Sequence, residues 1–105
     1  MELASLQKTV DDWIKAHGGY FSELTNTVVL MEEVGELARH VSRTYGEQTY
    51  KANENPSGLS EELADVLFVL LCLANQTGTD LSEAILNSLE KKTSRDRERH
   101  KSINK

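Results

Sequence analysis

The stretch LADVLFVLLCLA, residues 63–74, decides the fold of this 105-residue chain. Eleven of its twelve residues are apolar, and Asp65 is the exception. Between a cap at Ser57 and a stop at Gly78, the pattern predicts a helix without a polar face, which has to be covered on every side. Three other short helices can shield such a helix only in part. The pattern therefore predicts that a second copy of the chain covers the rest, in a homodimer or a homotetramer.

Two helices are predicted before this stretch. Apolar residues recur at helical spacing from Leu3 to His17, and Gly18-Gly19 supplies a stop. A second apolar stripe follows Ser22, a suitable N-cap, and ends near Tyr45-Gly46. The first of these helices is expected to have about four turns.

A loop and a fourth helix complete the chain. The segment 46–58 is polar, holds the only proline and lacks an apolar period, so we expect a loop there. Asp80 and Glu83 form a start similar to a capping box for a helix that runs into the C-terminal tail. No strand or internal repeat is predicted. We expect one all-α domain over residues 1–105, a four-helix bundle.

The charge is distributed unevenly. Residues 1–90 carry five Lys or Arg against fifteen Asp or Glu, a net of −10, whereas residues 91–105 carry seven against two, a net of +5. An acidic body with a basic tail suits an anionic ligand that arrives with divalent cations. The tail equally fits a solvated helix end, because Lys and Arg favour helix C-termini. Nucleic acid is not an expected partner, since phosphate contacts would have to come from the tail alone.

Cysteine usage and hydropathy indicate the cellular compartment of the protein. The single cysteine, Cys72, lies inside the apolar stretch and is expected to be a buried thiol in a reducing compartment. No apolar stretch reaches the roughly 18 to 20 residues of a membrane span, and the N-terminus does not resemble a signal peptide. We therefore expect a cytoplasmic protein with no membrane partner.

Two acidic motifs, EVGE at residues 33–36 and ELAD at residues 62–65, carry the chemistry. Residues three apart in a helix point to one flank, so each motif presents two carboxylates together. Carboxylates beside core-facing residues need a partner or a cation. If the two helices are neighbours, the four groups Glu33, Glu36, Glu62 and Asp65 converge, and their oxygen ligands favour Mg²⁺, with Mn²⁺ as the other choice. The alternative is a solvated charged face.

The sequence also suggests roles for three further residues outside the two motifs. Glu32 projects almost opposite the apolar stripe and is either solvent-facing or a base beside the site. His40 lies one turn after Glu36 and is expected to be a half-exposed helix residue rather than its partner. Trp13 lies on the apolar face of the first helix, where core packing is favoured over stacking on a ligand.

These residues resemble the MazG-like all-α nucleoside triphosphate pyrophosphohydrolases, whose signature is Glu-x-x-Glu on one helix and Glu-x-x-Asp on the next. LMEEVGELARHV and LSEELADVLFVLLCLA are similar to the two motif helices, and the resemblance covers roughly residues 24–90. It implies hydrolysis of a (deoxy)nucleoside triphosphate to the monophosphate and pyrophosphate. It also implies that Glu33, Glu36, Glu62 and Asp65 are the metal ligands and that Glu32 matches an extra leading Glu of many members. A carboxylate not fully committed to the metal, Glu32 or Glu33, is expected to accept a proton from the attacking water.

The family's downstream pattern is matched less closely. Many members carry Lys, Asn and Arg at three-residue steps, where this chain has Lys91, Ser94 and Arg97. Lys92 and Arg95 compete for the same roles. We expect one lysine and one arginine of this tail to contact phosphate, and we assign Lys91 and Arg95. Candidates for stacking on a nucleobase are Trp13, His17, Tyr20, Phe21 and Tyr45.

Two other functions stay open on the sequence. Phosphoribosyl-ATP pyrophosphohydrolase of histidine synthesis has similar acidic helices and a similar length. A helical oligomer that binds a metal or a nucleotide without turnover would also keep the acids. Release of pyrophosphate from a panel of nucleotides with Mg²⁺ distinguishes these functions.

Overall fold

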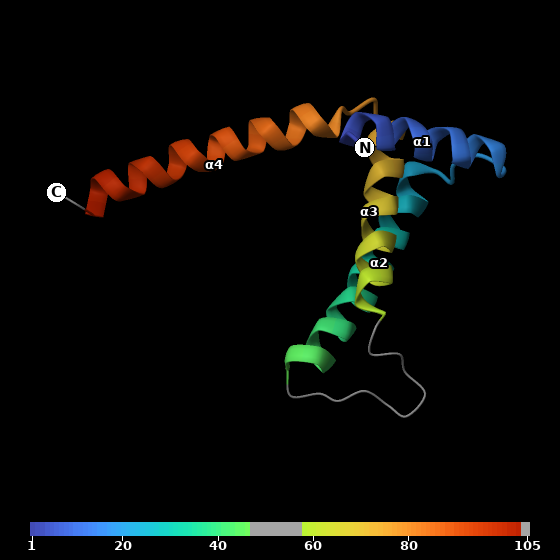
Figure 1. Ribbon diagram of the computed structural model, residues 1–105, viewed down its shortest axis with the longest axis horizontal. Coiled ribbons are helices and arrows are strands. Elements are labelled where there is room, and N and C mark those ends of the chain that lie inside the picture. The colour runs from blue at the N-terminus through green and yellow to red at the C-terminus, as the bar shows by residue number, and fades with distance from the viewer. Residues whose placement is uncertain (47–57, 104–105) are drawn as a thin grey trace.

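The structure is a computed structural model that describes residues 1–46 and 58–103, with side chains described as far as residue 98 at the C-terminal end. It contains four α-helices, which are α1 (Leu3–Ala16), α2 (Glu23–Tyr45), α3 (Leu59–Gln76) and α4 (Leu81–Ile103) (Figure 1). The described ranges contain no strand, so the all-α prediction is confirmed. Most of the predicted loop 46–58, with the predicted cap Ser57, lies outside the described residues.

Two helices begin where the sequence predicts. The hydroxyl of Ser22 accepts a hydrogen bond from the backbone N–H of Thr25 at 3.1 Å and so caps α2. The carboxylate of Asp80 accepts from the N–H groups of Ser82 and Glu83, at 2.9 and 3.2 Å, and caps α4. Each cap satisfies donors that have no partner inside the helix.

Glycines end α1 and α3, also as predicted. Gly18 and Gly19 follow α1 with φ of 108° and 90°, and Gly78 follows α3 with φ of 67°. A side chain is strained at these angles, whereas glycine adopts them freely.

Three helices pack together and the fourth projects. Helices α2 and α3 lie side by side over most of their length, and α1 crosses the C-terminal part of α3 (Figure 1). Helix α4 leaves this group as an arm whose main contacts are with the start of α1. The prediction of four helices is confirmed, but α4 does not lie alongside α2 and α3 within one chain. Three of its apolar residues, Ile85, Leu86 and Leu89, are exposed.

The chain is more extended than a compact domain of its size. Its radius of gyration is 17.9 Å, against about 13 Å for a compact chain of this length. Its accessible surface is 7962 Å², against about 5,900 Å² for a compact monomer of the same mass. The excess, about 2,000 Å² per chain, is of the size that an obligate interface covers.

The core is small and lies in the C-terminal half of α3. The buried apolar residues among the described ones are Val69, Leu71, Cys72 and Ala74. Other residues of the same apolar stretch remain exposed, including Leu63 at 52% and Leu67 at 41%. Within one chain, α3 is therefore covered only in part, as its sequence predicts.

Trp13 does not have the core position that its helical register predicts. Its side chain is 52% exposed. The indole stacks on His17, with ring centroids 4.3 Å apart, and meets the edge of Phe68 at 5.9 Å. The prediction of core packing was wrong, because the described helices cover the indole only from the side of Phe68 on α3.

A buried amide joins the helices at the base of α4. Gln7 of α1 is 8% exposed, and its Nε2 donates to the carbonyl of Thr79 at 2.9 Å and to Asn75 Oδ1 at 3.3 Å. Its Oε1 accepts from the backbone N–H of Leu81 at 2.9 Å. Because buried polar groups are costly when unpaired, these bonds fix where α4 starts relative to α1 and α3.

Candidate metal centre

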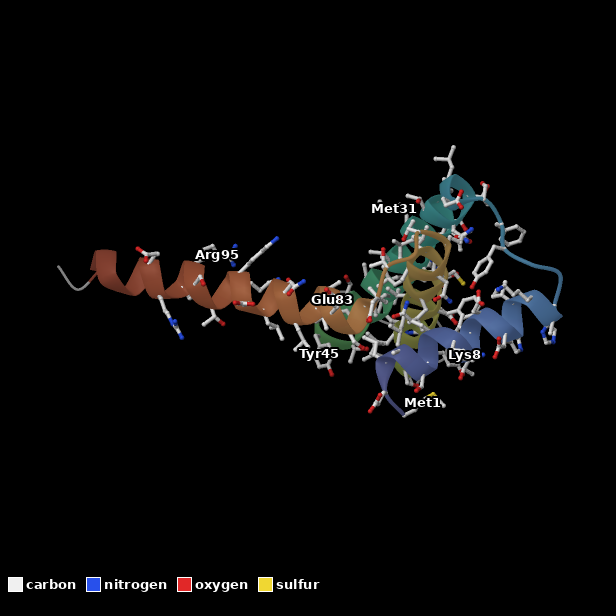
Figure 2. The ribbon with its side chains drawn as sticks, turned by 90° about the horizontal axis from the view of Figure 1, so that it is seen from above. Met1, Lys8, Met31, Tyr45, Glu83 and Arg95 are labelled. Atoms are coloured by element: carbon white, nitrogen blue, oxygen red, sulfur yellow. The ribbon has the colours of Figure 1, made fainter. Side chains whose placement is uncertain are left out.

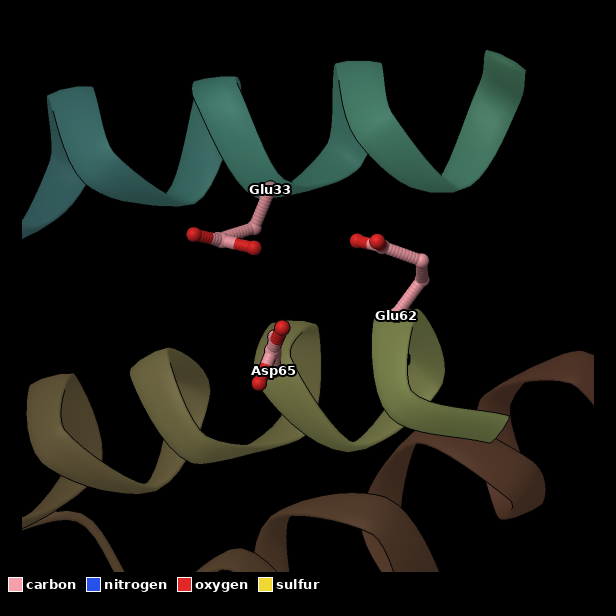
Figure 3. Close-up of side chains that lie close together, drawn as sticks. All are labelled: Glu33, Glu62 and Asp65. Carbon is pink, nitrogen blue, oxygen red and sulfur yellow. The ribbon is translucent and has the colours of Figure 1, made fainter. Parts of the chain in front are cut away.

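Three carboxylates converge between α2 and α3. Glu33 comes from α2, and Glu62 and Asp65 come from α3, one helical turn apart. One oxygen of each lies within 4.8 Å of the others, and Figure 3 shows the three side chains pointing into the same space. Glu33 and Glu62 are half-buried and Asp65 is exposed. We call this set the three-acid group. The predicted convergence of the two motifs is found for these three residues.

Partial burial and the neighbouring acids both disfavour the charged form of Glu33. Its pKa is raised above the ordinary value of 4.5, first because the side chain is partly removed from water, and then because of the charges of Asp65 and Glu62. The charges of Glu36 and Glu32 add smaller contributions in the same direction. A cation placed among these oxygens would reverse the effect.

Glu36, the fourth predicted ligand, lies outside the three-acid group. Its Oε1 accepts a hydrogen bond from Arg39 Nη2 at 2.8 Å, an ion pair between residues three apart on α2. Both side chains are about half exposed, so this bond is weak and can be exchanged for another. Glu32 is exposed on the same helix. The roles of Glu36 as ligand and Glu32 as base stay predictions.

His40 of α2 lies close to Glu62 of α3, a member of the three-acid group. Its Nε2 lies 3.6 Å from Glu62 Oε1, and the exposed fractions of the two side chains are 15% and 18%. From the sequence, His40 was expected to be a half-exposed residue on the flank of Glu36, because residues four apart meet on one helix. The cross-helix contact to Glu62 depends on how α2 packs against α3.

A hollow of 240 Å³ opens beside Glu62 on the side of the C-terminal half of α2. We call it the arginine hollow, since Arg39 and Arg43 line it together with His40, Gly58 and the acids Glu36, Glu61 and Glu62. These are two of the five Lys or Arg in residues 1–90. Their presence next to an acidic group gives the hollow cationic donors that the sequence analysis did not identify.

A pocket of 270 Å³ opens on the other side of the group. Glu33 and Asp65 form one wall, so the pocket and the three-acid group are continuous. The remaining lining is largely apolar and comes from α1, the α1–α2 connection, α2 and α3: Ile14, Gly19, Tyr20, Phe21, Asn26, Val29, Phe68, Val69 and Cys72. We call it the apolar pocket. Of the five predicted stacking residues, it contains Tyr20 and Phe21.

The predicted phosphate contacts of the tail are remote from the acids of the same chain. Lys91 and Arg95 are exposed on the projecting part of α4. Figure 2 shows Arg95 far along this arm from the three packed helices. Within one chain the structure does not bring these cations to the three-acid group.

The comparisons with known proteins agree with this architecture. A family profile described as the MazG nucleotide pyrophosphohydrolase domain matches residues 21–100. The chain belongs to the MazG nucleotide pyrophosphohydrolase family. The matched region contains all three residues of the three-acid group and most of the apolar pocket.

Individual relatives extend the match. YpjD of Bacillus subtilis (strain 168) is 44% identical over 98 residues, which cover 92% of this chain and 88% of that protein. A crystal structure of YpjD from Bacillus subtilis superposes with a TM-score of 0.78 and 43% identity, covering 87% of this chain and 94% of that one. A Bacillus-conserved MazG protein, described as a nucleotide pyrophosphohydrolase, superposes with a TM-score of 0.75 and 40% identity, covering 87% and 88%.

Membership of the MazG family confirms the resemblance drawn from the acidic motifs. None of the helices in the described ranges is both long and apolar enough to cross a membrane.

Three residues that line the pocket or the hollow were not identified from the sequence: Asn26, Arg39 and Arg43. No local pattern identifies Asn26, because its hydrogen-bond partner Gln76 lies 50 residues away in the sequence.

Proposed function

We propose that this MazG-family chain hydrolyses (deoxy)nucleoside triphosphates to the monophosphate and pyrophosphate, with Mg²⁺ or Mn²⁺ as cofactor. One observation supports this most directly. The three-acid group lies between a hollow with two arginines and a pocket with aromatic walls. A nucleotide has the same order of parts, since its α-phosphate lies between the nucleoside and the outer phosphates.

The three-acid group fits a divalent cation of the magnesium type. All donors are carboxylate oxygens, the ligands that hard cations prefer. Two oxygens on one Mg²⁺ lie at most about 4.2 Å apart, close to the spacing within the group. Glu33, Glu62 and Asp65 would hold the ion, and rotation of Glu36 away from Arg39 would add the fourth predicted ligand. When bound, such an ion neutralises phosphate charge and lowers the pKa of a bound water.

The reaction itself is a substitution at the α-phosphorus. The oxygen of a water forms a bond to this phosphorus, and the bond from the phosphorus to the bridging oxygen of the β-phosphate breaks. The bridging oxygen keeps the electron pair and leaves with pyrophosphate. Glu32 or Glu33 accepts the proton that the water loses. Comparing the pH profiles of Glu32→Gln and Glu33→Gln identifies which one does so.

The arginine hollow is suited to the outer phosphates. A guanidinium group can donate two parallel hydrogen bonds to phosphate oxygens, and such charge-assisted bonds are strong. Arg39 and Arg43 lie on the side of the acids away from the apolar pocket. They would hold the leaving pyrophosphate while Glu36 exchanges its arginine partner for the cation.

A second copy of the chain is part of this proposal. The uncovered face of α3, the large excess of accessible surface and the exposed apolar residues of α4 all suit a homodimer or homotetramer. The net charges of body and tail are opposite, so α4 of one copy would be attracted to the acidic body of another. Lys91 and Arg95 would then reach the phosphates at the partner's three-acid group.

Pyrophosphate release tests the activity. The purified protein is incubated with the common ribo- and deoxyribonucleoside triphosphates and with phosphoribosyl-ATP, with and without Mg²⁺. We expect metal-dependent release from at least one nucleoside triphosphate. Release from phosphoribosyl-ATP alone would assign the chain to histidine synthesis, and no release from any substrate would defeat the proposal.

Mixed oligomers test whether α4 acts across subunits. Asp65→Asn removes a residue of the acid site, and the double variant Lys91→Ala/Arg95→Ala removes the cations of the arm. Each homo-oligomer should be nearly inactive, while an oligomer reconstituted from both variants should regain a substantial fraction of activity. If the mixture stays as inactive as its components, both sets of residues belong to one chain's site or the arm has no role.

A further inference from the structure

We propose that the apolar pocket is the nucleobase subsite of this enzyme and that Asn26 reads the edge of the base. The inference rests on the proposed function and adds to it a residue that selects the substrate. Three observations carry it: the continuity of the pocket with the three-acid group, the burial of Asn26, and the hydrogen bonds that orient its amide.

The pocket is joined to the acids along α2. Glu33 and Asp65 belong to the wall of the pocket, and Asn26 lines it as well. Asn26 and Glu33 are seven residues apart, so they share one face of α2 about 10 Å apart along its axis. A ligand that fills the pocket therefore reaches from Asn26 to the three-acid group, as a nucleoside reaches from its base to its α-phosphate.

The walls suit a flat aromatic ring. Tyr20, Phe21 and Phe68 offer aromatic surface, and Val29 and Val69 offer aliphatic surface. A base stacked on such side chains gains binding energy whatever its identity, because every base has an aromatic face. The volume of 270 Å³ is small for a complete nucleotide and is close to the lower end of the usual range for ligand pockets. The phosphates would remain outside, at the acids.

Asn26 is a buried polar group in the largely apolar part of this lining. It is 6% exposed, and its Nδ2 donates to Gln76 Oε1 at 2.8 Å. Within residues 1–46 and 58–103, its side chain makes no other hydrogen bond. An amide has two N–H donors and a carbonyl acceptor. One donor and the acceptor of Asn26 are therefore left for a ligand.

The orientation of this amide is set by its neighbours. Gln76 Nε2 donates to the backbone carbonyl of Phe21 at 2.6 Å. Because a carbonyl can only accept, this bond directs the Nε2 of Gln76 to Phe21 and its Oε1 to Asn26. Asn26 must then present an N–H to Gln76, so the Oδ1 of Asn26 is not the atom that faces Gln76. An amide held in this way keeps one N–H donor and its carbonyl oxygen for a ligand, and both are groups that can bond to the edge of a base.

The remaining polar groups near the pocket are accounted for without a ligand. The hydroxyl of Tyr20 donates to Asp11 at 2.6 Å and accepts from Asn75 at 3.0 Å. Burial raises the pKa of the Cys72 thiol, so Cys72 forms a neutral part of the wall. Among the residues of the pocket away from the acids, Asn26 is thus the one equipped to discriminate between bases.

The test compares substrates with and without a base. The kcat/KM of the preferred nucleoside triphosphate is divided by that of ribose 5-triphosphate, which has the phosphates and the sugar only. Asn26→Ala should lower this ratio by about 10-fold or more, as expected for the loss of a two-bond base contact. Thr27→Ala, on the next residue of α2, is the matched control, because Thr27 is exposed and bonds only to the carbonyl of Glu23. It should leave the ratio unchanged.

A structural role would give a different result. If Asn26 serves only to hold Gln76, Asn26→Ala lowers the turnover of both substrates together, and the constant ratio would overturn the proposal. If this variant does not fold, as judged by circular dichroism, Val29→Phe fills the pocket from its wall instead. It should lower the same ratio, and an unchanged ratio would again count against a base subsite.

Nucleoside binding separates this inference from the proposed reaction. If the wild-type protein releases pyrophosphate from no substrate, the reaction fails but the pocket is still tested. Nucleosides without phosphates are titrated into the protein, and the side-chain amide resonances of Asn26 are followed by NMR. Saturable shifts of these resonances would support a base subsite, whereas the absence of shifts with all nucleosides would refute it.

Discussion

Asp65→Asn should stabilise the metal-free protein and remove its stabilisation by Mg²⁺. Asp65 faces Glu33 and Glu62 within 4.8 Å, and the three charges repel one another when no cation is present. The substitution keeps the size of the side chain and removes one charge. It also removes an oxygen ligand, since an amide binds Mg²⁺ less well than a carboxylate does.

The expected gain follows from Coulomb's law. Two unit charges 4.8 Å apart repel by about 0.9 kcal/mol in water. Asp65 is exposed, so the value for water applies rather than a larger one, and its two neighbours together give about 1 to 2 kcal/mol. Salt reduces this further. For a domain of this size, such a gain raises the melting temperature by about 4 to 10 °C.

Thermal unfolding at one protein concentration measures both effects. In the wild type, Mg²⁺ at 100 times its Kd should stabilise the fold by about 2.7 kcal/mol, and in Asp65→Asn most of this increment should vanish. Glu23→Gln is the control, because Glu23 is an exposed acid in the first turn of α2 that belongs neither to the three-acid group nor to the lining of the hollow or the pocket. A lower melting temperature of metal-free Asp65→Asn, or an undiminished response to Mg²⁺, would refute the reasoning.

Three further predictions concern the fold and the interface between copies of the chain. Gln7→Leu should destabilise the protein by about 2 to 4 kcal/mol in urea unfolding, because its hydrogen-bond partners stay buried and unpaired, while the exposed Lys8→Ala should change little. Burial and the bond to Asp11 raise the pKa of Tyr20 from 10.0 to about 12. The neutral phenol is thus favoured by folding, so its contribution to stability is complete below pH 10 and is lost as the pH rises to about 12. Ultraviolet titration of the wild type against Tyr20→Phe should show this midpoint, and an ordinary value would contradict the burial. Leu89→Asp, which puts a charge on the exposed apolar face of α4, should lower the mass found by light scattering at micromolar concentration; an unchanged mass would exclude this face from the interface.

Much of the fold could be predicted because its signals are local. The caps at Ser22 and Asp80 and the glycine stops depend on a few neighbouring residues, and all are found where the sequence places them. The position of α4 could not be predicted in this way. Periodicity shows that a helix has an apolar face, but not whether this face meets its own chain or another.

For the candidate site, too, some residues could be predicted from the sequence and others could not. The convergence of Glu33 with Glu62 and Asp65 required only that α2 and α3 be neighbours, which their apolar stripes indicate. Glu36 differs because Arg39, three residues on, offers a competing partner within the same helix. Asn26 was missed because its partner Gln76 lies 50 residues away, beyond any local pattern.

The bonds of Gln7 at the root of α4 have a mechanical consequence. Helix α4 has 23 residues, so it is a rod about 34 Å long. A tilt of 10° at the root moves the far end by about 6 Å, more than the length of one helical turn. Small adjustments around one amide are therefore magnified at the tip. Substitutions there would change the direction of α4 as well as the stability of the fold, and the change in direction would affect a neighbouring molecule that contacts the far end of α4.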